Sequence, residues 1–371
     1  MSSHTRPKLT AGEISGLIRS FPLLATTIVA FIWTSSWSQW KSGNFGGKTL
    51  RRNAAASVGT VISFLSPRQV RSLFAHTTGE AIKLYCAAHG LTHQSTLVKN
   101  DDGFPPATLH FVDCELTRNG PILLYFHGGG FIVPLNSPAY AVSLARTAGA
   151  SLVLLEYTLA PECVYPGQLS QSIAALRLIL QHRNPSEIII AGESAGGNIA
   201  LAIMAHLQEP KIGISPLVVS EKFKGLLAIS PRTANKPQAN SFQYNGGKDF
   251  MNKKSLSAIT ATWKPADDVW AAPVLARAGF WDGLKAARAL LVVGENEVYH
   301  DDVCHVANIM GATGNTGRIT MKGNLEKAID PAVQLIVCPG EMHCQASLDK
   351  GLGITDGHMT QGIVRWLSCL E

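Results

Sequence analysis

Residues 187–201 read EIIIAGESAGGNIAL, and this stretch decides the fold class of the 371-residue chain. An apolar β-branched run passes directly into a small-residue helical pattern through Gly192-Glu193-Ser194-Ala195-Gly196, which has the spacing G-x-S-x-G. A strand that turns this tightly into a helix lifts the serine onto a strained corner above the sheet edge. Glycines flank such a corner because a Cβ there would collide with the adjoining strand or helix. The stretch predicts a nucleophilic Ser194, although an ordinary strand-to-helix turn uses the same residue types.

On both sides of this corner, short β-rich runs alternate with segments whose apolar residues have helical spacing. The expected strands cover residues 108–114, 122–126, 152–157, 187–191, 225–229, 290–293 and 333–337. Strands that alternate with helices form βαβ units and a mostly parallel sheet, so the chain is predicted to be an α/β protein. The alternation lapses between residues 231 and 281, a stretch too long for a simple loop, which indicates an inserted cap segment.

The first 104 residues are predicted to form a helical cap region, and residues 105–371 the catalytic domain. From residue 46 to about residue 97 the pattern stays helical, which places these elements outside the sheet. The apolar run from Phe21 to Trp33 is shorter than the roughly 18 residues of a spanning helix, and no small-residue cleavage pattern follows it. Trp33, Trp37 and Trp40 share one helix face. Such a stripe usually packs on the rest of the protein, and an aromatic lid or membrane-surface face is the alternative.

The composition limits which binding partners and which cellular location are expected. The net charge is +6, and the basic residues are scattered without runs, which argues against nucleic acid. Seven cysteines without a C-x-x-C pair favour reduced thiols in an intracellular, cytoplasmic protein. Peripheral membrane association through the N-terminal cap is the alternative location. A homodimer is compatible with the sequence, which does not specify the oligomeric state.

A second informative stretch is ILLYFHGGGF, residues 122–131, in which an apolar strand runs into three successive glycines. Such a loop exposes backbone N–H groups without side-chain obstruction, as a tetrahedral oxyanion requires. A flexible glycine turn or a phosphate-binding loop is the other interpretation. Phosphate loops follow G-x-x-x-x-G-K-[ST] or G-x-G-x-x-G and lead straight into a helix, and neither pattern is present here. No cofactor is expected.

Together these motifs resemble the hormone-sensitive-lipase-like branch of the α/β-hydrolases. The resemblance covers residues 105–371, and the N-terminal helices resemble those of fungal steryl-acetyl-hydrolase-like members. The motifs that carry it are His127–Phe131 (HGGGF), Tyr157–Glu162 (YTLAPE), Tyr165-Pro166 and Gly192–Asn198 (GESAGGN). It implies an α/β-hydrolase fold, a helical cap and serine esterase chemistry. It also implies that Gly129, Gly130 and Ala195 donate the oxyanion N–H groups.

The acid and the base of a serine mechanism must follow Ser194 in the order acid, then histidine. His343, in a loop just after the last apolar strand, is the expected base. Glu297 matches the acid of the family's D-P-L-x-D pattern, and Asp301 matches its second, non-catalytic carboxylate; Asp301 remains the alternative acid. Two positions depart from the family: Glu193 stands where Asp is usual, and Thr158 stands where the family has Arg.

Other functions fit parts of the same pattern. Five residues, Glu297, His300, Asp301, Cys304 and His305, have the types of metal ligands, but they lack H-E-x-x-H or paired-cysteine spacing, so no metal is expected. A non-hydrolytic acyl transferase or cyclase would use the same scaffold, whereas a binding-only receptor would be free to lose a catalytic residue. The apolar cap residues Phe21, Phe31, Trp33 and Trp37 predict a hydrophobic ester, such as a steroid-like, terpenoid or polyketide acetate.

Overall fold

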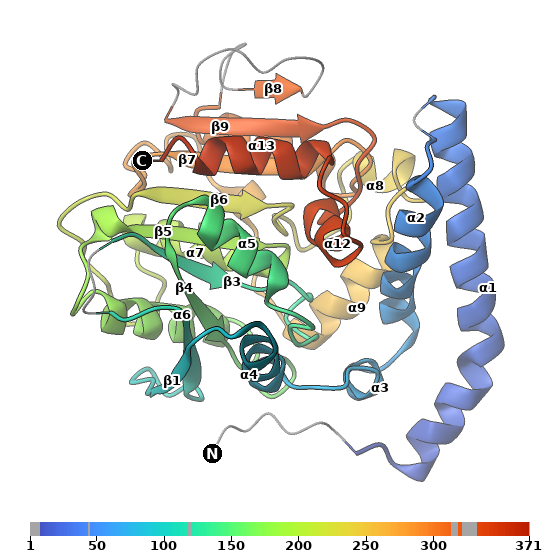
Figure 1. The fold of residues 1–371 in the computed structure, drawn as a ribbon, viewed down its shortest axis with the longest axis horizontal. Helices are drawn as coiled ribbons and strands as arrows, with labels where there is room; N and C mark the ends of the chain where they lie inside the picture. Colours follow the sequence, from blue (N-terminus) through green and yellow to red (C-terminus); the bar gives the residue numbers. More distant parts are fainter. Residues whose placement is uncertain (1–7, 44, 117–119, 313–317, 321–331, 371) are drawn as a thin grey trace.

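The computed structural model describes residues 8–43, 45–116, 120–312, 318–320 and 332–370, except the side chains of residues 62, 63 and 318–320. In these parts of the chain, nine strands form one sheet in the order β1-β2-β4-β3-β5-β6-β7-β9-β8 (Figure 1). The strands are β1 (His93–Val98), β2 (Ala107–Val112), β3 (Ile122–Phe126), β4 (Ser151–Glu156), β5 (Ile188–Glu193), β6 (Gly225–Ile229), β7 (Ala289–Gly294), β8 (Arg318–Thr320) and β9 (Val333–Cys338). Among the described strands β2 alone pairs antiparallel with both of its neighbours, β1 and β4, so the predicted mostly parallel sheet is confirmed.

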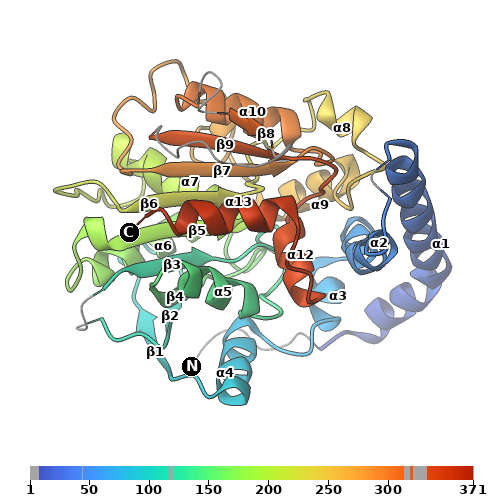
Figure 2. The ribbon, with the colours of Figure 1, turned by 45° about the horizontal axis from the view of Figure 1, so that its top comes forward.

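Helices cover both faces of the sheet, as Figure 2 shows. One face carries α4 (Thr78–His89), α5 (Ala139–Thr147) and α13 (His358–Leu367), and the other carries α6 (Gly167–Ile179), α7 (Ala195–Gln208) and α10 (His300–Ile309). Successive side chains of a strand point to opposite faces. In β5, Ile188 and Ile190 therefore pack in the α7 layer, whereas Ile189 and Ala191 pack in the α13 layer. Burial on both faces explains why this strand is continuously apolar.

Strand β1 corrects one prediction, because it lies in a stretch that the sequence pattern assigned to helices. The strand reads HQSTLV, is mostly exposed and occupies the edge of the sheet. It pairs antiparallel with β2, from His93 opposite Val112 to Val98 opposite Ala107. A polar edge strand carries little apolar alternation, so its partner strand rather than its own pattern specifies it.

The N-terminal helices cover one end of the molecule. Helix α1 (Ala11–Lys41) runs beside α2 (Thr49–Ser57) and the 3₁₀ helix η1 (Val58–Phe64), and α3 (Pro67–Ser72) follows (Figure 1). By length and composition α1 could cross a membrane. Thr10 and Glu13 form a capping box at its start, which satisfies backbone donors that have no partner within the helix.

The tryptophan stripe of α1 does not pack on the rest of the protein, so that expectation is wrong. The residues of α1 that are buried are Phe31, Ser35 and Gln39, which recur every four residues. This spacing defines the inner face of the helix. Trp33, Trp37 and Trp40 are offset from that face and are exposed.

The segment between residues 231 and 281 carries α8 (Ser241–Tyr244), α9 (Lys253–Trp263) and the 3₁₀ helix η3 (Pro273–Leu275). Helix α9 packs against η1. In Figure 1 both α9 and α2 lie at the end of the sheet where α12 (Gln345–Gly351) is found. Parts of the chain that are distant in sequence thus surround the carboxyl ends of the parallel strands, where ligands bind in open α/β sheets.

Candidate active site

Ser194 occupies the sharp corner between β5 and α7. Its φ is +52°, which lies in the left-handed region that a non-glycine residue rarely adopts. A Cβ at Gly192 would overlap the carbonyl of Gly196, and a Cβ at Gly196 would overlap the carbonyl of Phe126. The backbone N–H of Ser194 donates to Ile229 O at 2.9 Å, which ties the corner to β6. Close backbone packing therefore explains both glycines, as the sequence pattern predicted.

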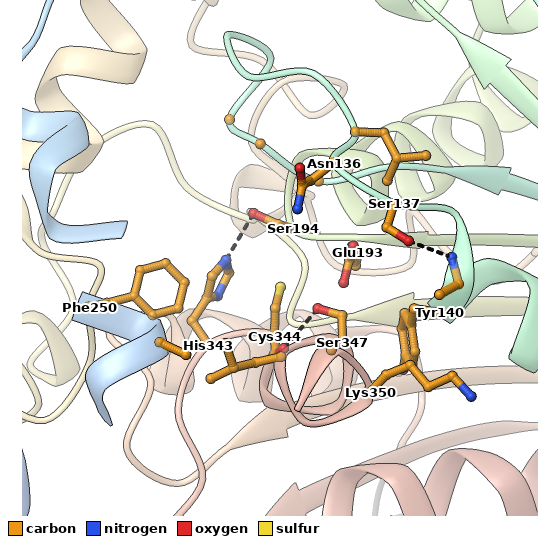
Figure 3. Close-up of a pocket in the computed structure, with 18 of the residues that line it drawn as sticks. Asn136, Ser137, Tyr140, Glu193, Ser194, Phe250, His343, Cys344, Ser347 and Lys350 are labelled. Atoms are coloured by element: carbon orange, nitrogen blue, oxygen red, sulfur yellow. Dashed lines mark hydrogen bonds between the residues drawn. The ribbon is translucent and has the colours of Figure 1, made fainter. Parts of the chain in front are cut away.

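The structure brings His343 and Glu297 together with Ser194. His343 Nε2 lies 2.9 Å from Ser194 Oγ, and His343 Nδ1 lies 3.1 Å from Glu297 Oε2. Figure 3 shows the imidazole directed at the serine hydroxyl. His343 and Glu297 are both buried. Burial opposes charge on the imidazole, but neighbouring Cys344 and Glu297 raise the pKa of His343 well above its usual range. The carboxylate of Glu297 thus stabilises the imidazolium that forms when His343 accepts a proton.

Glu297 is held by neighbours that the sequence analysis did not identify. Its Oε1 atom accepts from Ser230 Oγ at 2.5 Å and from the N–H of Gly294 at 2.6 Å. Asn245 Nδ2 donates to the backbone carbonyl of Glu297 at 2.8 Å. Asp249 Oδ2 accepts from the N–H of Val298 at 2.9 Å. Ser230 directly follows β6, and a polar residue just past a buried parallel strand was the available signal.

Asp301 hydrogen-bonds to α8 and to no atom of His343. Its Oδ2 atom accepts from the N–H of Ser241 at 2.9 Å, and its Oδ1 atom accepts from Tyr244 Oη at 2.5 Å. Asp301 therefore fixes α8, and the carboxylate in contact with His343 belongs to Glu297. Among the described residues no group of three His, Cys, Asp or Glu side chains is placed to hold a metal ion.

The glycine loop after β3 lines the same pocket as Ser194. Gly129 has φ +108° and Gly130 has φ +60°, so glycine relieves backbone strain at both positions. Ala195 is the first residue of α7, where backbone N–H groups lack partners within the helix. In the described part of the chain, no group accepts a hydrogen bond from the N–H of Gly129, Gly130 or Ala195. These are the three donors that the family resemblance implies.

A pocket of about 520 Å³ opens above Ser194. Its walls come from the glycine loop, α5, α12, α9, the loop before α9 and α2. Met251, Ile259 and Leu348 make one part of it apolar, while Asn136, Ser137 and Ser347 make another part polar. Phe250 stands edge-on to His343 with ring centroids 5.6 Å apart (Figure 3).

The four aromatic residues that the sequence analysis used to infer the substrate do not line this pocket. Phe21, Trp33 and Trp37 are exposed on α1, and Phe31 is buried against Ala56 and Met342. Helical periodicity identified their shared faces but could not show where α1 lies relative to Ser194. The apolar character of the site comes instead from residues 250–259 and from α12.

Thr158 takes part in an amide network at the position where the family has Arg. Gln171 Oε1 accepts from the N–H of Thr158 at 2.9 Å, and Gln171 Nε2 donates to Thr158 Oγ1 at 2.8 Å. Nearby, the guanidinium of Arg71 donates to the carbonyls of Ile132 and Ala160 and pairs with Glu162. A guanidinium from α3 therefore braces this segment and the glycine loop.

Residues 123–346 match the sequence pattern of the family described as alpha/beta hydrolase fold. The chain belongs to this family. Its motifs and relatives place it in the hormone-sensitive-lipase-like branch. As an α/β-hydrolase, the chain is 30% identical over 206 residues to a carboxylesterase of Mycobacterium tuberculosis, a match that covers 53% of this chain and 62% of that protein. It is 25% identical to versiconal hemiacetal acetate esterase of Aspergillus parasiticus, over 70% of this chain and 78% of that protein.

Solved structures with the same fold include two esterases. Carboxyl esterase 2 of Tuber melanosporum matches with a TM-score of 0.60 and 19% identity, covering 76% of this chain and 86% of that one. An esterase from the bacterial hormone-sensitive lipase family matches with a TM-score of 0.59 and 22% identity, covering 86% and 96%. At these identities the likeness concerns the fold. It supports the α/β-hydrolase fold that the resemblance implied.

Proposed function

We propose that this α/β-hydrolase is a carboxylic ester hydrolase with Ser194, His343 and Glu297 as its catalytic triad. The observation that carries the proposal is the continuous hydrogen-bonded chain from Ser194 Oγ through both imidazole nitrogens to a buried carboxylate. This arrangement is recognised by geometry and roles, whatever the fold that carries it. The esterase relatives support the same reaction class.

In the proposed reaction, Ser194 Oγ attacks the ester carbonyl carbon while its proton passes to His343 Nε2. The resulting oxyanion lies against the N–H groups of Gly129, Gly130 and Ala195, which stabilise it more than the ground-state carbonyl. Collapse of the tetrahedral intermediate breaks the bond to the alcohol, and His343 returns the proton to the departing oxygen. Water then attacks the acyl-enzyme in the same way, and release of the acid regenerates Ser194.

Glu297 has an orienting and electrostatic role in this scheme. Its Oε2 atom accepts from His343 Nδ1–H, which leaves Nε2 free to take the serine proton. The carboxylate also stabilises the imidazolium that forms during attack, in agreement with the raised pKa of His343. Because Glu297 is buried, its negative charge acts through a medium that screens less than water does.

The proposed substrate is a hydrophobic ester, such as an acetylated steroid-like, terpenoid or polyketide alcohol of fungal secondary metabolism. A pocket of 520 Å³ is within the usual range for small-molecule sites. Met251, Ile259 and Leu348 offer apolar contacts for the bulky part of such a molecule. The relative named versiconal hemiacetal acetate esterase is consistent with an acetate ester.

Active-site labelling and product analysis test this proposal. A fluorophosphonate should add to Ser194, as located by peptide mass spectrometry, and Ser194→Ala should abolish both labelling and turnover. Incubation with a panel of acetylated lipophilic alcohols should release acetate and free alcohol. Products whose masses show acyl transfer or cyclisation without gain of water would replace hydrolysis with that reaction. Wild-type turnover by Ser194→Ala would overturn the serine mechanism.

A further inference from the structure

The outer side of α1 is apolar over most of its length. Residues 21–40 contain no charged side chain, and they span roughly 30 Å of helix. The exposed residues in this stretch are Phe21, Pro22, Leu23, Thr26, Val29, Ala30, Trp33, Thr34, Trp37 and Trp40. Scattered single apolar residues are normal on a protein surface, but an uncharged strip of this length marks an interaction site.

The two exposed threonines add little polarity to this strip. Thr26 Oγ1 donates to the carbonyl of Pro22 at 3.0 Å, and Thr34 Oγ1 donates to the carbonyl of Ala30 at 2.9 Å. Each hydroxyl donor is thus satisfied by the helix itself and does not require water. A surface without charges and with internally bonded hydroxyls is suited to an apolar medium.

Residues on the strip and beside its ends suit the boundary between a lipid bilayer and water. Trp33 stacks on Trp37, and Trp37 stacks on Trp40, with ring centroids 6.4 and 5.0 Å apart. Tryptophan is enriched where a membrane meets water. Lys41 lies 5.3 Å from the ring centroid of Trp37, and Arg19 is exposed beyond the other end of the strip. These cations complement lipid phosphates.

The inner side of α1 is already occupied by protein. Leu17, Leu24 and Ile28 pack against the main core, and Phe31 packs with Ala56 and Met342. Ser35 Oγ donates to Asn53 Oδ1 at 3.2 Å. A helix that spans a bilayer as a single anchor is surrounded by lipid, whereas α1 is docked on one side and free on the other. This one-sided arrangement is that of a helix lying in the membrane plane.

We propose that α1 docks the protein on a lipid bilayer, with the outer strip inserted at the boundary between headgroups and acyl chains. Helix α2 lies next to α1 and contributes Ala55 to the wall of the pocket above Ser194. Docking therefore holds this pocket within about one helix diameter of the membrane surface, roughly 10 Å. A lipophilic substrate would enter from the layer in which it is concentrated.

The proposal is tested by co-sedimentation of the full-length protein with vesicles of phosphatidylcholine and phosphatidylserine mixed three to one. The double variant Val29→Glu/Trp33→Glu places two charges on the strip, where the native side chains are 66% and 70% exposed. It should lower the bound fraction about tenfold or more, since charge is costly in the apolar layer. The matched control Ile212→Glu/Val218→Glu adds the same charge at positions 91% and 89% exposed outside α1 and should bind as the wild type does.

Further measurements distinguish in-plane membrane docking from deeper insertion and from a dimer formed through the strip. Circular dichroism checks folding, and Trp37→Gln/Trp40→Gln, without added charge, replaces the first variant if that one is misfolded. Phosphatidylcholine brominated near the headgroup should quench tryptophan fluorescence more than lipid brominated at the chain end. Stronger quenching by the chain-end lipid would overturn insertion at the headgroup boundary. No binding, equal binding by all variants, or a dimer that the strip variants dissociate would overturn membrane docking.

The result does not depend on the proposed reaction. Ser194→Ala leaves α1 unchanged and should bind vesicles as the wild type does. If Ser194→Ala binds but the wild type hydrolyses no ester, the reaction is wrong and the docking stands. If the wild type hydrolyses esters but does not bind vesicles, the docking is wrong and the reaction stands.

Discussion

Ser230 Oγ donates a 2.5 Å hydrogen bond to Glu297 Oε1 and accepts one of 3.1 Å from the backbone N–H of Cys344. One hydroxyl therefore joins the loop after β6, the carboxylate of Glu297 and the residue next to His343. Ser230 is buried and its backbone has φ +43°, a strained value for a residue other than glycine. The surrounding structure therefore holds this residue in place. Ser230 is a positioning residue, because it acts on the reaction through Glu297.

Ser230→Ala should lower kcat by roughly tenfold to a hundredfold with little change in KM. Loss of one partner leaves a buried carboxylate oxygen short of a hydrogen bond, which costs about 1–3 kcal/mol. Steady-state kinetics on a soluble short-chain ester should show a shifted acid limb in the pH profile of kcat. Ser172→Ala removes another buried serine hydroxyl, in α6, and should leave that profile unchanged. A loss confined to thermal stability would assign Ser230 a structural role only.

Glu297→Gln should lower kcat by about 10⁴, whereas Asp301→Asn should cost roughly tenfold or less. Ser230 and Gly294 both donate to Oε1 of Glu297, so the carbonyl oxygen of a glutamine would stay there. Its amide N–H₂ would then face His343 Nδ1 and favour the wrong tautomer. Both variants should be measured on one chromogenic ester. A crippled Asp301→Asn beside a nearly normal Glu297→Gln would reassign the acid.

Gly59→Ala should reduce kcat/KM by about tenfold, because a Cβ on Gly59 would overlap the ring of Phe250. The displaced ring would disturb the pocket and the edge-on contact with His343. Phe250→Ala removes the obstacle, so adding Gly59→Ala to that variant should cost little more. The four forms make a double-mutant cycle in kcat/KM. Strict additivity would show that the contact does not transmit strain from η1 to the pocket.

Asp302→Asn should stabilise the protein at pH 8 and have little effect at pH 4. Burial, with help from Asp301, raises the pKa of Asp302 from 3.8 to about 7. The folded state thus keeps a proton that the unfolded state has lost, and stability falls as pH rises from about 4 to about 7. The asparagine of the variant carries no titrating proton, so the variant does not lose stability in this way. The difference in free energy of unfolding between variant and wild type should therefore grow from about pH 4 to about pH 7 and stay constant above that.

The plateau should be of the order of 2 kcal/mol, because the position in the first turn of α10 favours the charged form and offsets part of the shift. Urea unfolding at several pH values gives the measurement. Asp301→Asn, in the same turn, should gain less stability toward high pH than Asp302→Asn, because its amide oxygen can accept only one of the hydrogen bonds that Ser241 and Tyr244 donate. A pH-independent difference for Asp302→Asn would contradict the protonated folded state.

The sequence predicted those features whose local backbone geometry allows only a few residue types. The corner at Ser194 needs glycine at 192 and 196 because backbone carbonyls occupy the space of a Cβ. Strand β5 is apolar throughout because both faces of the sheet are covered, and its length and flanks marked it as a strand. The order of Ser194, Glu297 and His343 followed from how the fold threads its strands.

Features that depend on which surfaces meet could not be read from residue patterns. Glu297 and Asp301 lie one helical turn apart with the same chemistry, and only the loop after β9 shows which of them faces His343. Strand β1 exists because β2 offers it an edge.

The spacing of Trp33, Trp37 and Trp40 was correct as a helix face, but it could not tell an inner face from an outer one. That choice depends on contacts of Phe31 and Ser35 with parts of the chain distant in sequence. Periodicity thus determined which side chains of α1 lie together. Packing against α2 and the loop before α9 decided which of these side chains are buried and which remain exposed. The sequence of α1 alone could not show this, because the surfaces that cover its inner face come from other parts of the chain.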